Sequence, residues 1–400
     1  MPPKDCILIQ SNPMKKLTLP LLILISIIIL LAARSNPPDP IQSQLVNSSE
    51  FAPVTDPTGF TRAEGPLPLT FPADQGPHPD YLTEWWYYTG NLDTPDGRHF
   101  GFQLTFFRRA LVPPADRAAD RASDWAADQV YLAHFALTDV DGEQFHSFER
   151  FSRGAADLAG AQATPYRVWL ENWTVEEISP NTYHLLAEQG QLKLDLELTP
   201  AKKYVLHGDQ GYSQKGPEPG NASTYISQTR LAATGTVQTK DGTFEVSGLA
   251  WMDHEYSTSV LSEGQIGWDW FSVQLSDQTE IMFFQLRRED GSVDPFSSGT
   301  IIYSDETTRP LTKDDFTITV LDTWRSPHSG ADYPARWQVT IPSENLTLTL
   351  EPWLPDQELQ VSVIYWEGAV RVEGTHNGQP VTGNGYVELT GYAAPFDGDF

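Results

Sequence analysis

The densest group of ionisable side chains in the sequence is Trp-Met-Asp-His-Glu-Tyr at residues 251–256, in an otherwise apolar, β-prone stretch. On a β-strand, Asp253 and Glu255 share one face, whereas His254 shares the other face with Tyr256. His254 could ligate a metal, transfer a proton or orient a substrate, or form a structural hydrogen bond. The other histidines show no zinc-ligand spacing, so we expect neither a metal nor a cofactor. Only one of the two faces can line a given pocket.

A second acidic candidate, Glu84, begins the run Glu-Trp-Trp-Tyr-Tyr at residues 84–88. Alternation along a strand places Glu84, Trp86 and Tyr88 on one face. If this face lines the interior of a barrel, burial raises the pKa of Glu84, which suits a general acid or a ligand anchor. The alternative is that Glu84 pairs with an arginine such as Arg108 and that the aromatic residues form the core.

These two segments and the hairpin expected at residues 268–285 make up the predicted site. The catalytic candidates are the ionisable residues His254, Asp253, Glu255, Tyr256 and Glu84. The ligand-binding candidates are Trp86, Tyr88, His134, Trp251, Trp268, Trp270, Phe283 and Gln285. The sequence lacks the motifs of the usual serine hydrolases, nucleotide enzymes and common zinc proteases, so we exclude these classes.

The elements that must position these residues are predicted to be short antiparallel strands. Runs rich in Trp, Tyr, Phe, Val and Thr alternate with Asp-Gly and Asn-Gly turn pairs, which is typical of β-hairpins. One helical excursion is expected at residues 113–129, where Pro114 can start a helix. The predicted fold class is therefore all-β.

Two internal repeats predict two tandem units. Residues 86–104 and 268–286 have the same length and both end in Phe-Gln-Leu, so each is expected to be a first hairpin. Residues 246–253 and 381–388 match in residue class, so each is expected to be a last strand. Each unit suits an up-and-down antiparallel barrel, which closes its edges and can hold one small ligand. Two β-sandwiches fit the strand spacing nearly as well.

The sequence divides into a signal peptide or membrane anchor at residues 1–34, a flexible linker at 35–76, a first barrel at 77–258 and a second at 259–400. Two lysines precede the uncharged stretch 17–33, which resembles a secretory signal and is also at the lower length limit of a membrane-spanning helix. We therefore expect an exported protein, periplasmic or extracellular, or one anchored to the inner membrane by this stretch.

The charge balance argues against nucleic acid as a partner. The chain has 53 acidic and 26 basic residues and a formal net charge of -27, whereas nucleic-acid binders need a basic surface. The single cysteine, Cys6, precedes the apolar stretch, so the body has neither a disulfide nor a thiolate site.

At its aromatic and acidic motifs the chain resembles the AttH-like family, which includes bacterial carotenoid 1,2-hydratases (hydroxyneurosporene synthases) and is related to lipocalin-like pericyclases of fungal decalin biosynthesis. The matching passages are residues 84–90, 102–108, 132–136, 248–256, 267–270 and 383–392. The resemblance implies two tandem lipocalin-like antiparallel β-barrels behind an N-terminal signal or anchor helix. It also implies an envelope role beside a permease of the lipoprotein-release type.

The resemblance also implies a reaction. The carotenoid hydratases protonate an isoprenoid double bond and add water without a cofactor, using an aspartate aided by His, Trp and Tyr neighbours. By this resemblance the histidine matches His254, and the aromatic residue after it matches Tyr256. The position of the aspartate falls on Gln285, so an amide replaces the proton donor in this chain.

We therefore expect the protein to bind a lipophilic ligand, isoprenoid or lipid-like, and two functions stay open. The first is cofactor-free lyase (hydratase) or isomerase chemistry in which Asp253, His254, Glu255 or Glu84 manages protons. The second is a non-catalytic lipid carrier or envelope accessory protein. A third, weaker alternative is an adhesion or scaffold module whose barrels are filled by side chains.

Overall fold

The described part of the chain is built from β-strands and short 3₁₀ turns, which confirms the all-β fold class. The computed structural model describes residues 57–117, 123, 125–259 and 261–396. The predicted signal or anchor helix and the linker up to residue 56 lie outside these residues, so both stay predictions. Within the described residues, no helix is long and apolar enough to cross a membrane.

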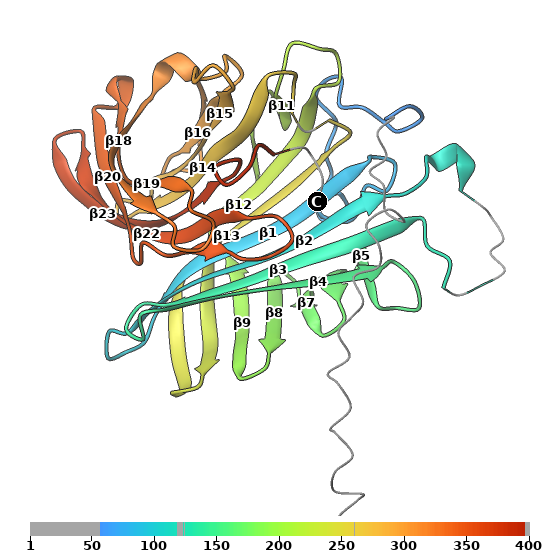
Figure 1. The fold of residues 1–400 in the computed structure, drawn as a ribbon, viewed down its shortest axis with the longest axis horizontal. Helices are drawn as coiled ribbons and strands as arrows, with labels where there is room; N and C mark the ends of the chain where they lie inside the picture. Colours follow the sequence, from blue (N-terminus) through green and yellow to red (C-terminus); the bar gives the residue numbers. More distant parts are fainter. Residues whose placement is uncertain (1–56, 118–122, 124, 260, 397–400) are drawn as a thin grey trace, which may run out of the picture. The chain divides into compact units, whose positions relative to one another are not determined.

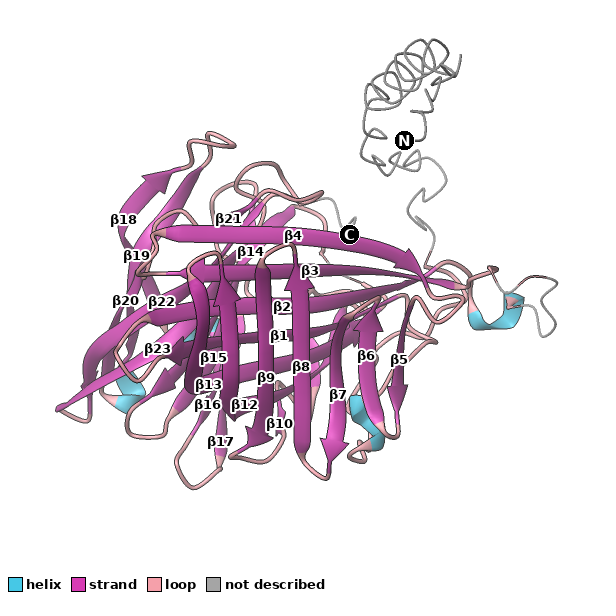
Figure 2. Ribbon diagram, turned by 90° about the horizontal axis from the view of Figure 1, so that it is seen from below, coloured by secondary structure: helices cyan, strands magenta, loops and turns pink. Residues whose placement is uncertain are grey.

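The first sheet is antiparallel and curls into a barrel. Its strands are β1 (Thr83–Asp93), β2 (His99–Ala110), β3 (Gln129–Asp139), β4 (Gln144–Arg153), β5 (Ala159–Ala163), β6 (Tyr166–Leu170), β7 (Trp173–Ser179), β8 (Thr182–Gln189), β9 (Leu192–Pro200), β10 (Val205–Leu206), β11 (Tyr212–Gln214), β12 (Ala222–Thr239) and β13 (Gly242–Ser257). The strand order is β4-β3-β2-β1-β13-β12-β9-β8-β7-β6-β5, and β10 and β11 pair with β12. Figure 2 shows β1–β4 crossing β7–β9, so the sheet folds over on itself.

The second sheet is also antiparallel and curls into a half-barrel (Figure 1). Its strands are β14 (Gln265–Leu275), β15 (Glu280–Arg288), β16 (Ser298–Ile302), β17 (Thr308–Thr312), β18 (Thr317–Arg325), β19 (Asp332–Ile341), β20 (Leu346–Pro352), β21 (Glu358–Leu359), β22 (Tyr365–His376) and β23 (Gln379–Leu389). The strand order is β17-β16-β15-β14-β23-β22-β20-β19-β18, and β21 pairs with β22.

The two predicted repeats are confirmed as a first hairpin and a last strand in each sheet. Strand β1 pairs with β2 and with the last strand β13, and β14 pairs in the same way with β15 and β23. Among the described strands, neither sheet closes through backbone hydrogen bonds between its two edge strands, as the predicted complete barrels would. The hydrogen-bonded paths of the described strands end at β4 and β5 in the first sheet and at β17 and β18 in the second, so edge strands remain.

Alternation along the strands produces a separate core in each sheet and a third cluster between the sheets. The first core includes Phe102 and Leu196, and the second includes Phe271 and Trp337, all buried. The third cluster is formed by aromatic and apolar residues of both sheets, among them Tyr87, Trp251, Trp270 and Tyr386. The described residues between 57 and 396 accordingly form one compact unit, and the predicted domain boundary lies in the connection between β13 and β14.

The segment before β1, residues 57–76, belongs to the folded body, which corrects the predicted extent of the flexible linker. Gln75 is buried, and its side-chain oxygen accepts hydrogen bonds from Tyr183 Oη at 3.2 Å and Tyr204 Oη at 2.6 Å. Its backbone oxygen accepts a hydrogen bond from Trp86 Nε1 at 3.1 Å. These few hydrogen bonds order a segment whose composition, rich in Pro, Gly and Thr, resembles a linker.

The predicted helix at residues 113–129 is wrong for the described residues. The 3₁₀ turns are η3 (Ala73–Gln75), η4 (Pro114–Asp116), η5 (Lys313–Asp315) and η6 (Pro342–Glu344). The turn η4 ends at Asp116, and the backbone of the next residue, Arg117, is extended. Arg117 Nη1 contacts Asp80 Oδ1 at 3.2 Å, which ties the extended chain to the loop before β1.

Candidate functional site

Alternation sends neighbouring residues of β1 and β13 to opposite faces of the first sheet. In the β1–β13 register, Trp86 lies opposite His254 and Tyr87 lies opposite Asp253. His254 is on the barrel side, where its ring stacks on Trp86 with centroids 5.0 Å apart. Asp253 and Glu255 line a pocket on the other side, which faces the second sheet. The acidic residues, and not the histidine, therefore reach the space between the sheets.

Glu84 is fully buried on the barrel side and is held by Arg108 and two histidines. Arg108 Nε donates to Glu84 Oε2 at 2.8 Å, and His254 Nε2 and His78 Nδ1 contact Glu84 Oε1 at 2.8 and 3.0 Å. Burial alone raises the pKa of Glu84, but the charge of Arg108 and the histidine hydrogen bonds outweigh it and hold the pKa well below its ordinary value. The predicted raised pKa is wrong, and the alternative pairing with Arg108 is confirmed.

The cluster around Glu84 brings together side chains of the types that bind metals. Ligand atoms of His78, Glu84 and His254 lie within 4.8 Å of one another. However, both histidines contact the same carboxylate oxygen, and Arg108 places its positive charge at the other one. A divalent cation would have to displace these hydrogen bonds beside a guanidinium group. The residues therefore fit a hydrogen-bonded cluster and do not fit a metal site.

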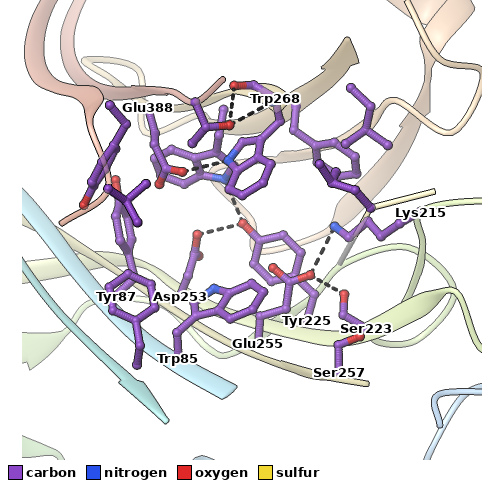
Figure 3. A pocket seen from close by; sticks show the side chains of 18 of the residues that line it. Trp85, Tyr87, Lys215, Ser223, Tyr225, Asp253, Glu255, Ser257, Trp268 and Glu388 are labelled. Carbon is purple, nitrogen blue, oxygen red and sulfur yellow. Dashed lines mark hydrogen bonds and ion pairs between the residues drawn. The ribbon is translucent and has the colours of Figure 1, made fainter. Parts of the chain in front are cut away.

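A pocket of about 100 Å³ opens where β1, β12 and β13 of the first sheet meet β14, β15 and β23 of the second. Figure 3 shows side chains from both sheets pointing into it. Its wall is mainly aromatic, but it also carries three carboxylates, one ammonium group and several hydroxyls. The lining residues are Trp85, Tyr87, Gln103, Phe107, Lys215, Ser223, Tyr225, Asp253, Glu255, Ser257, Ser259, Leu261, Trp268, Trp270, Phe284, Leu286, Val363, Tyr365, Glu388 and Thr390.

Asp253 is buried on the pocket wall and accepts three hydrogen bonds. Tyr225 Oη donates at 2.7 Å, Trp251 Nε1 donates at 2.6 Å, and the Ser227 hydroxyl also donates. Tyr225 Oη in turn accepts a hydrogen bond from Trp270 Nε1 at 2.8 Å, which fixes the phenol (Figure 3). Burial raises the pKa of Asp253 to about 7, and the three donors only partly oppose it. Asp253 can therefore hold or release a proton near neutral pH.

Glu255, two residues further along the same face, is neutralised by a lysine. Lys215 Nζ lies 3.1 Å from Glu255 Oε1, and the Ser223 hydroxyl donates to the same oxygen. The ammonium group also lies 3.9 Å from the centroid of the Phe284 ring, in a cation–π contact. The cation nearest to Asp253 on this wall is thus already paired with another acid.

The second sheet supplies a further acid, Glu388, on the pocket wall. Trp268 Nε1 donates to Glu388 Oε1 at 2.7 Å (Figure 3). Burial raises the pKa of Glu388 to about 7, opposed by hydrogen bonding from Trp268 and Glu367 and reinforced by the charge of Asp253. Sequence reasoning missed Glu388, although the repeat of the last strand could have indicated it. Glu388 occupies the same position in its repeated last strand as Asp253 does in the first unit.

Of the residues predicted on the second hairpin, Trp268 and Trp270 line the pocket, whereas Phe283 and Gln285 do not. Phe283 faces the core of the second sheet, and its neighbour Phe284 lines the pocket instead. The amide at Gln285, aligned with the acid of the hydratases, is therefore off this wall. Sequence reasoning also missed Trp85 and Tyr87, which lie on the face of β1 opposite to Glu84, and three pocket residues outside the acidic motifs, Lys215, Tyr225 and Phe284.

The remaining predicted residues lie on the barrel side or beneath the wall. Trp86 and Tyr88 are buried in the first core, and Tyr256 packs in a smaller cluster under the segment before β1. His134, predicted to bind the ligand, does not line the pocket. Instead its Nδ1 contacts Tyr365 Oη at 2.8 Å, behind the pocket wall.

The fold and the pocket define a class of proteins with two curled antiparallel sheets and an aromatic, acidic pocket between them. The AttH-like family model matches residues 62–392, and the chain belongs to the AttH-like family. This confirms the resemblance stated from the motifs.

Two solved structures share this architecture. The crystal structure of an AttH protein from Nitrosomonas europaea is 35% identical, with a TM-score of 0.72, over 82% of this chain and 99% of that chain. Kievitone hydratase from Nectria haematococca is 14% identical, with a TM-score of 0.62, over 84% of this chain and 98% of that chain, a likeness of fold alone. No curated protein sequence gives a significant match.

Proposed function

We propose that this protein binds a lipophilic, alkene-containing ligand in the pocket between the two sheets and catalyses cofactor-free proton transfer at a carbon–carbon double bond, as in hydration or isomerisation. Asp253 carries the proposal. It is a buried carboxyl group on an aromatic wall, and its pKa is raised to about 7. A general acid with a pKa near the working pH is protonated often enough to act and still gives up its proton readily.

The surroundings of Asp253 suit the charge that alkene protonation creates. When a proton adds to a double bond, positive charge develops on the neighbouring carbon. The rings of Tyr225, Trp270 and Trp268 present π-electron density to the pocket, and Glu388 adds negative charge. The largely aromatic lining also suits a lipophilic ligand. The fold is shared with a protein named as a hydratase, but the proposed reaction rests on these residues.

The test is exchange of hydrogen between solvent and ligand. Purified protein is incubated in deuterium oxide with farnesol and geranylgeraniol as probes, and deuterium at carbon and addition of water are followed by mass spectrometry. We expect both in the wild type and a loss of at least about 100-fold in Asp253→Asn. Native mass spectrometry checks that the variant still binds the probe.

Asp277→Asn is the matched control, because Asp277 lies in the turn after β14 and does not line the pocket. This variant should exchange at the wild-type rate. Binding of the probes without deuterium incorporation in the wild type would identify a lipid carrier and overturn the proposal of catalysis. Equal exchange in the wild type and in Asp253→Asn would remove Asp253 from the mechanism.

We also propose export of the body by the N-terminal segment, with an envelope permease as partner. The support is the lysine pair before the apolar stretch at residues 17–33 and the family resemblance. A fusion of residues 1–34 to alkaline phosphatase, which is active only outside the cytoplasm, tests export. An inactive fusion that is stably produced would contradict it.

A further inference from the structure

The two acids of the pocket occupy equivalent places in the two sheets but have different neighbours. Each lies on the last strand of its sheet, Asp253 on β13 and Glu388 on β23. On β12, the strand before β13, the residue opposite Asp253 is Ser227. On β22, the strand before β23, the residue opposite Glu388 is Glu367. A hydroxyl donor in one sheet is thus replaced by a second carboxyl group in the other.

Glu367 is fully buried and Glu388 is partly exposed to the pocket, and among the described residues neither carboxyl group forms an ion pair with a cation. The Glu367 oxygen Oε1 accepts a hydrogen bond from Tyr87 Oη. The ionisable groups around the pair are Asp253 and Glu255 from β13, Tyr87 from β1, Tyr365 from β22 and Tyr386 from β23, and Lys215 from the loop after β11 lines the same pocket. Lys215 is bound to Glu255. Two carboxylates so close together cannot both ionise at little cost, so the pair retains one proton at neutral pH.

We infer that Glu388 is the second catalytic residue of the pocket, taking a proton from water on the wall opposite Asp253, and that Glu367 is a positioning residue that holds the shared proton beside it. This inference rests on the proposed function, because it assigns the partner of Asp253 in the same reaction. It makes the pocket a site for the addition of water to a lipophilic alkene, and not only for isomerisation.

Addition of water forms a C–H bond and a C–O bond. The π-electron pair of the double bond forms the C–H bond with the proton of Asp253, which is left as a carboxylate. A lone pair of the water oxygen forms the C–O bond to the adjacent carbon, and the carboxylate of Glu388 takes one proton of that water. The product is an alcohol, and proton exchange with solvent returns Asp253 and Glu388 to their starting states. Two carboxyl groups on separate walls with room for water between them serve this purpose in inverting glycosidases.

Two isotopes separate the two acids. With farnesol as the probe, deuterium at carbon reports protonation, and labelled oxygen from the water reports addition. Glu388→Gln should lose oxygen incorporation by at least about 100-fold and keep deuterium exchange within about tenfold, because Asp253 still protonates the alkene. Asp253→Asn should lose both. Wild-type oxygen incorporation in Glu388→Gln overturns the inference and leaves the proposed function intact, whereas a wild type without either isotope overturns the proposed function itself.

Glu367 is tested through the pH profile of oxygen incorporation. Glu367→Leu removes the hydrogen bond that lowers the pKa of Glu388, so the acidic limb of the profile should move up by about one pH unit. Glu367→Gln keeps a neutral hydrogen-bonding group and should restore the wild-type limb. Infrared difference spectroscopy should show absorption of protonated carboxyl groups at neutral pH that is weaker in Glu367→Gln, because the contribution of Glu367 is removed and that of Asp253 remains. Identical pH profiles in all three proteins, with the infrared absorption unchanged, would leave Glu367 a purely structural residue.

Discussion

Glu84 and Asp253 are two buried carboxyl groups on opposite faces of the same pair of strands, β1 and β13, yet their protonation differs. Glu84 faces the barrel side and contacts the Arg108 guanidinium, which keeps its pKa well below the ordinary value. Asp253 faces the pocket and accepts hydrogen bonds only from neutral groups, so burial raises its pKa to about 7.

Burial by itself therefore does not make a carboxyl group a proton donor. Desolvation penalises the charged form of both residues, and the presence or absence of a cation in contact decides the result. One strand pair thus carries a structural carboxylate that is ionised at neutral pH on one face and a carboxyl group that titrates near neutral pH on the other.

The largest expected effect comes from removing the cation of Glu84. Arg108→Met leaves a buried carboxylate with only histidine partners, so we expect a loss of roughly 3–5 kcal/mol in the free energy of unfolding. Chemical denaturation at pH 7 measures it. The double variant Arg108→Met with Glu84→Gln should recover much of the loss. An unchanged stability in Arg108→Met would contradict the conclusion that the guanidinium group keeps Glu84 ionised.

The second prediction concerns the pH dependence of stability. The pKa of Asp253 is about 7 in the folded protein and 3.8 as the ordinary value, so the folded state binds more protons between these pH values. Asp253 therefore stabilises the folded protein at acid pH, and this stabilisation, at most about 4 kcal/mol, is lost as the pH rises toward 7. In Asp253→Asn, the free energy of unfolding should no longer fall by this amount over the same pH range, which chemical denaturation at a series of pH values measures. Glu84 acts in the opposite sense, because its stabilisation is lost only as the pH drops below its ordinary value of 4.5.

The third prediction uses two adjacent tryptophans of β1. Trp86 is buried in the first core, so Trp86→Leu should cost roughly 3 kcal/mol of stability. Trp85 lines the pocket, so Trp85→Leu should cost less than about 1 kcal/mol and weaken binding of farnesol severalfold. Thermal unfolding and native mass spectrometry report the two effects. Equal destabilisation by both changes would contradict the assignment of the faces.

The smallest expected effect is at Tyr225. Tyr225→Phe removes one donor to Asp253, so the pKa of Asp253 should rise by about one unit, which corresponds to about 1.4 kcal/mol. The pH at which the free energy of unfolding stops falling should therefore rise by about one unit. Tyr88→Phe is the control, because the Tyr88 hydroxyl contacts Tyr166 at 2.6 Å in the first core and its removal should leave this pH unchanged.

Much of the fold could be predicted, because turn pairs, strand alternation and the two repeats are local properties of the chain. Strand alternation alone also separates His254 from Asp253 and Glu255. The extent of the ordered segment before β1 could not be predicted, since it depends on Gln75 accepting hydrogen bonds from Tyr183 and Tyr204, on β8 and before β10.

The site could be predicted only in part, for two reasons. Alternation places Phe283 and Gln285 together on one face of β15 but does not say which face meets the other sheet, so Phe284 was passed over. Lys215 and Tyr225 were missed because they come from a loop and a strand far from the acidic motif.

The amino-acid sequence by itself determined the β-strands, their alternating faces and the two-unit repeat, because these depend on neighbouring residues. Only the tertiary structure decided that Arg108 meets Glu84 and that no free cation of the described residues meets Asp253, because both depend on strand register and on the packing of one sheet against the other. The chemistry of the two acids follows from those long-range contacts.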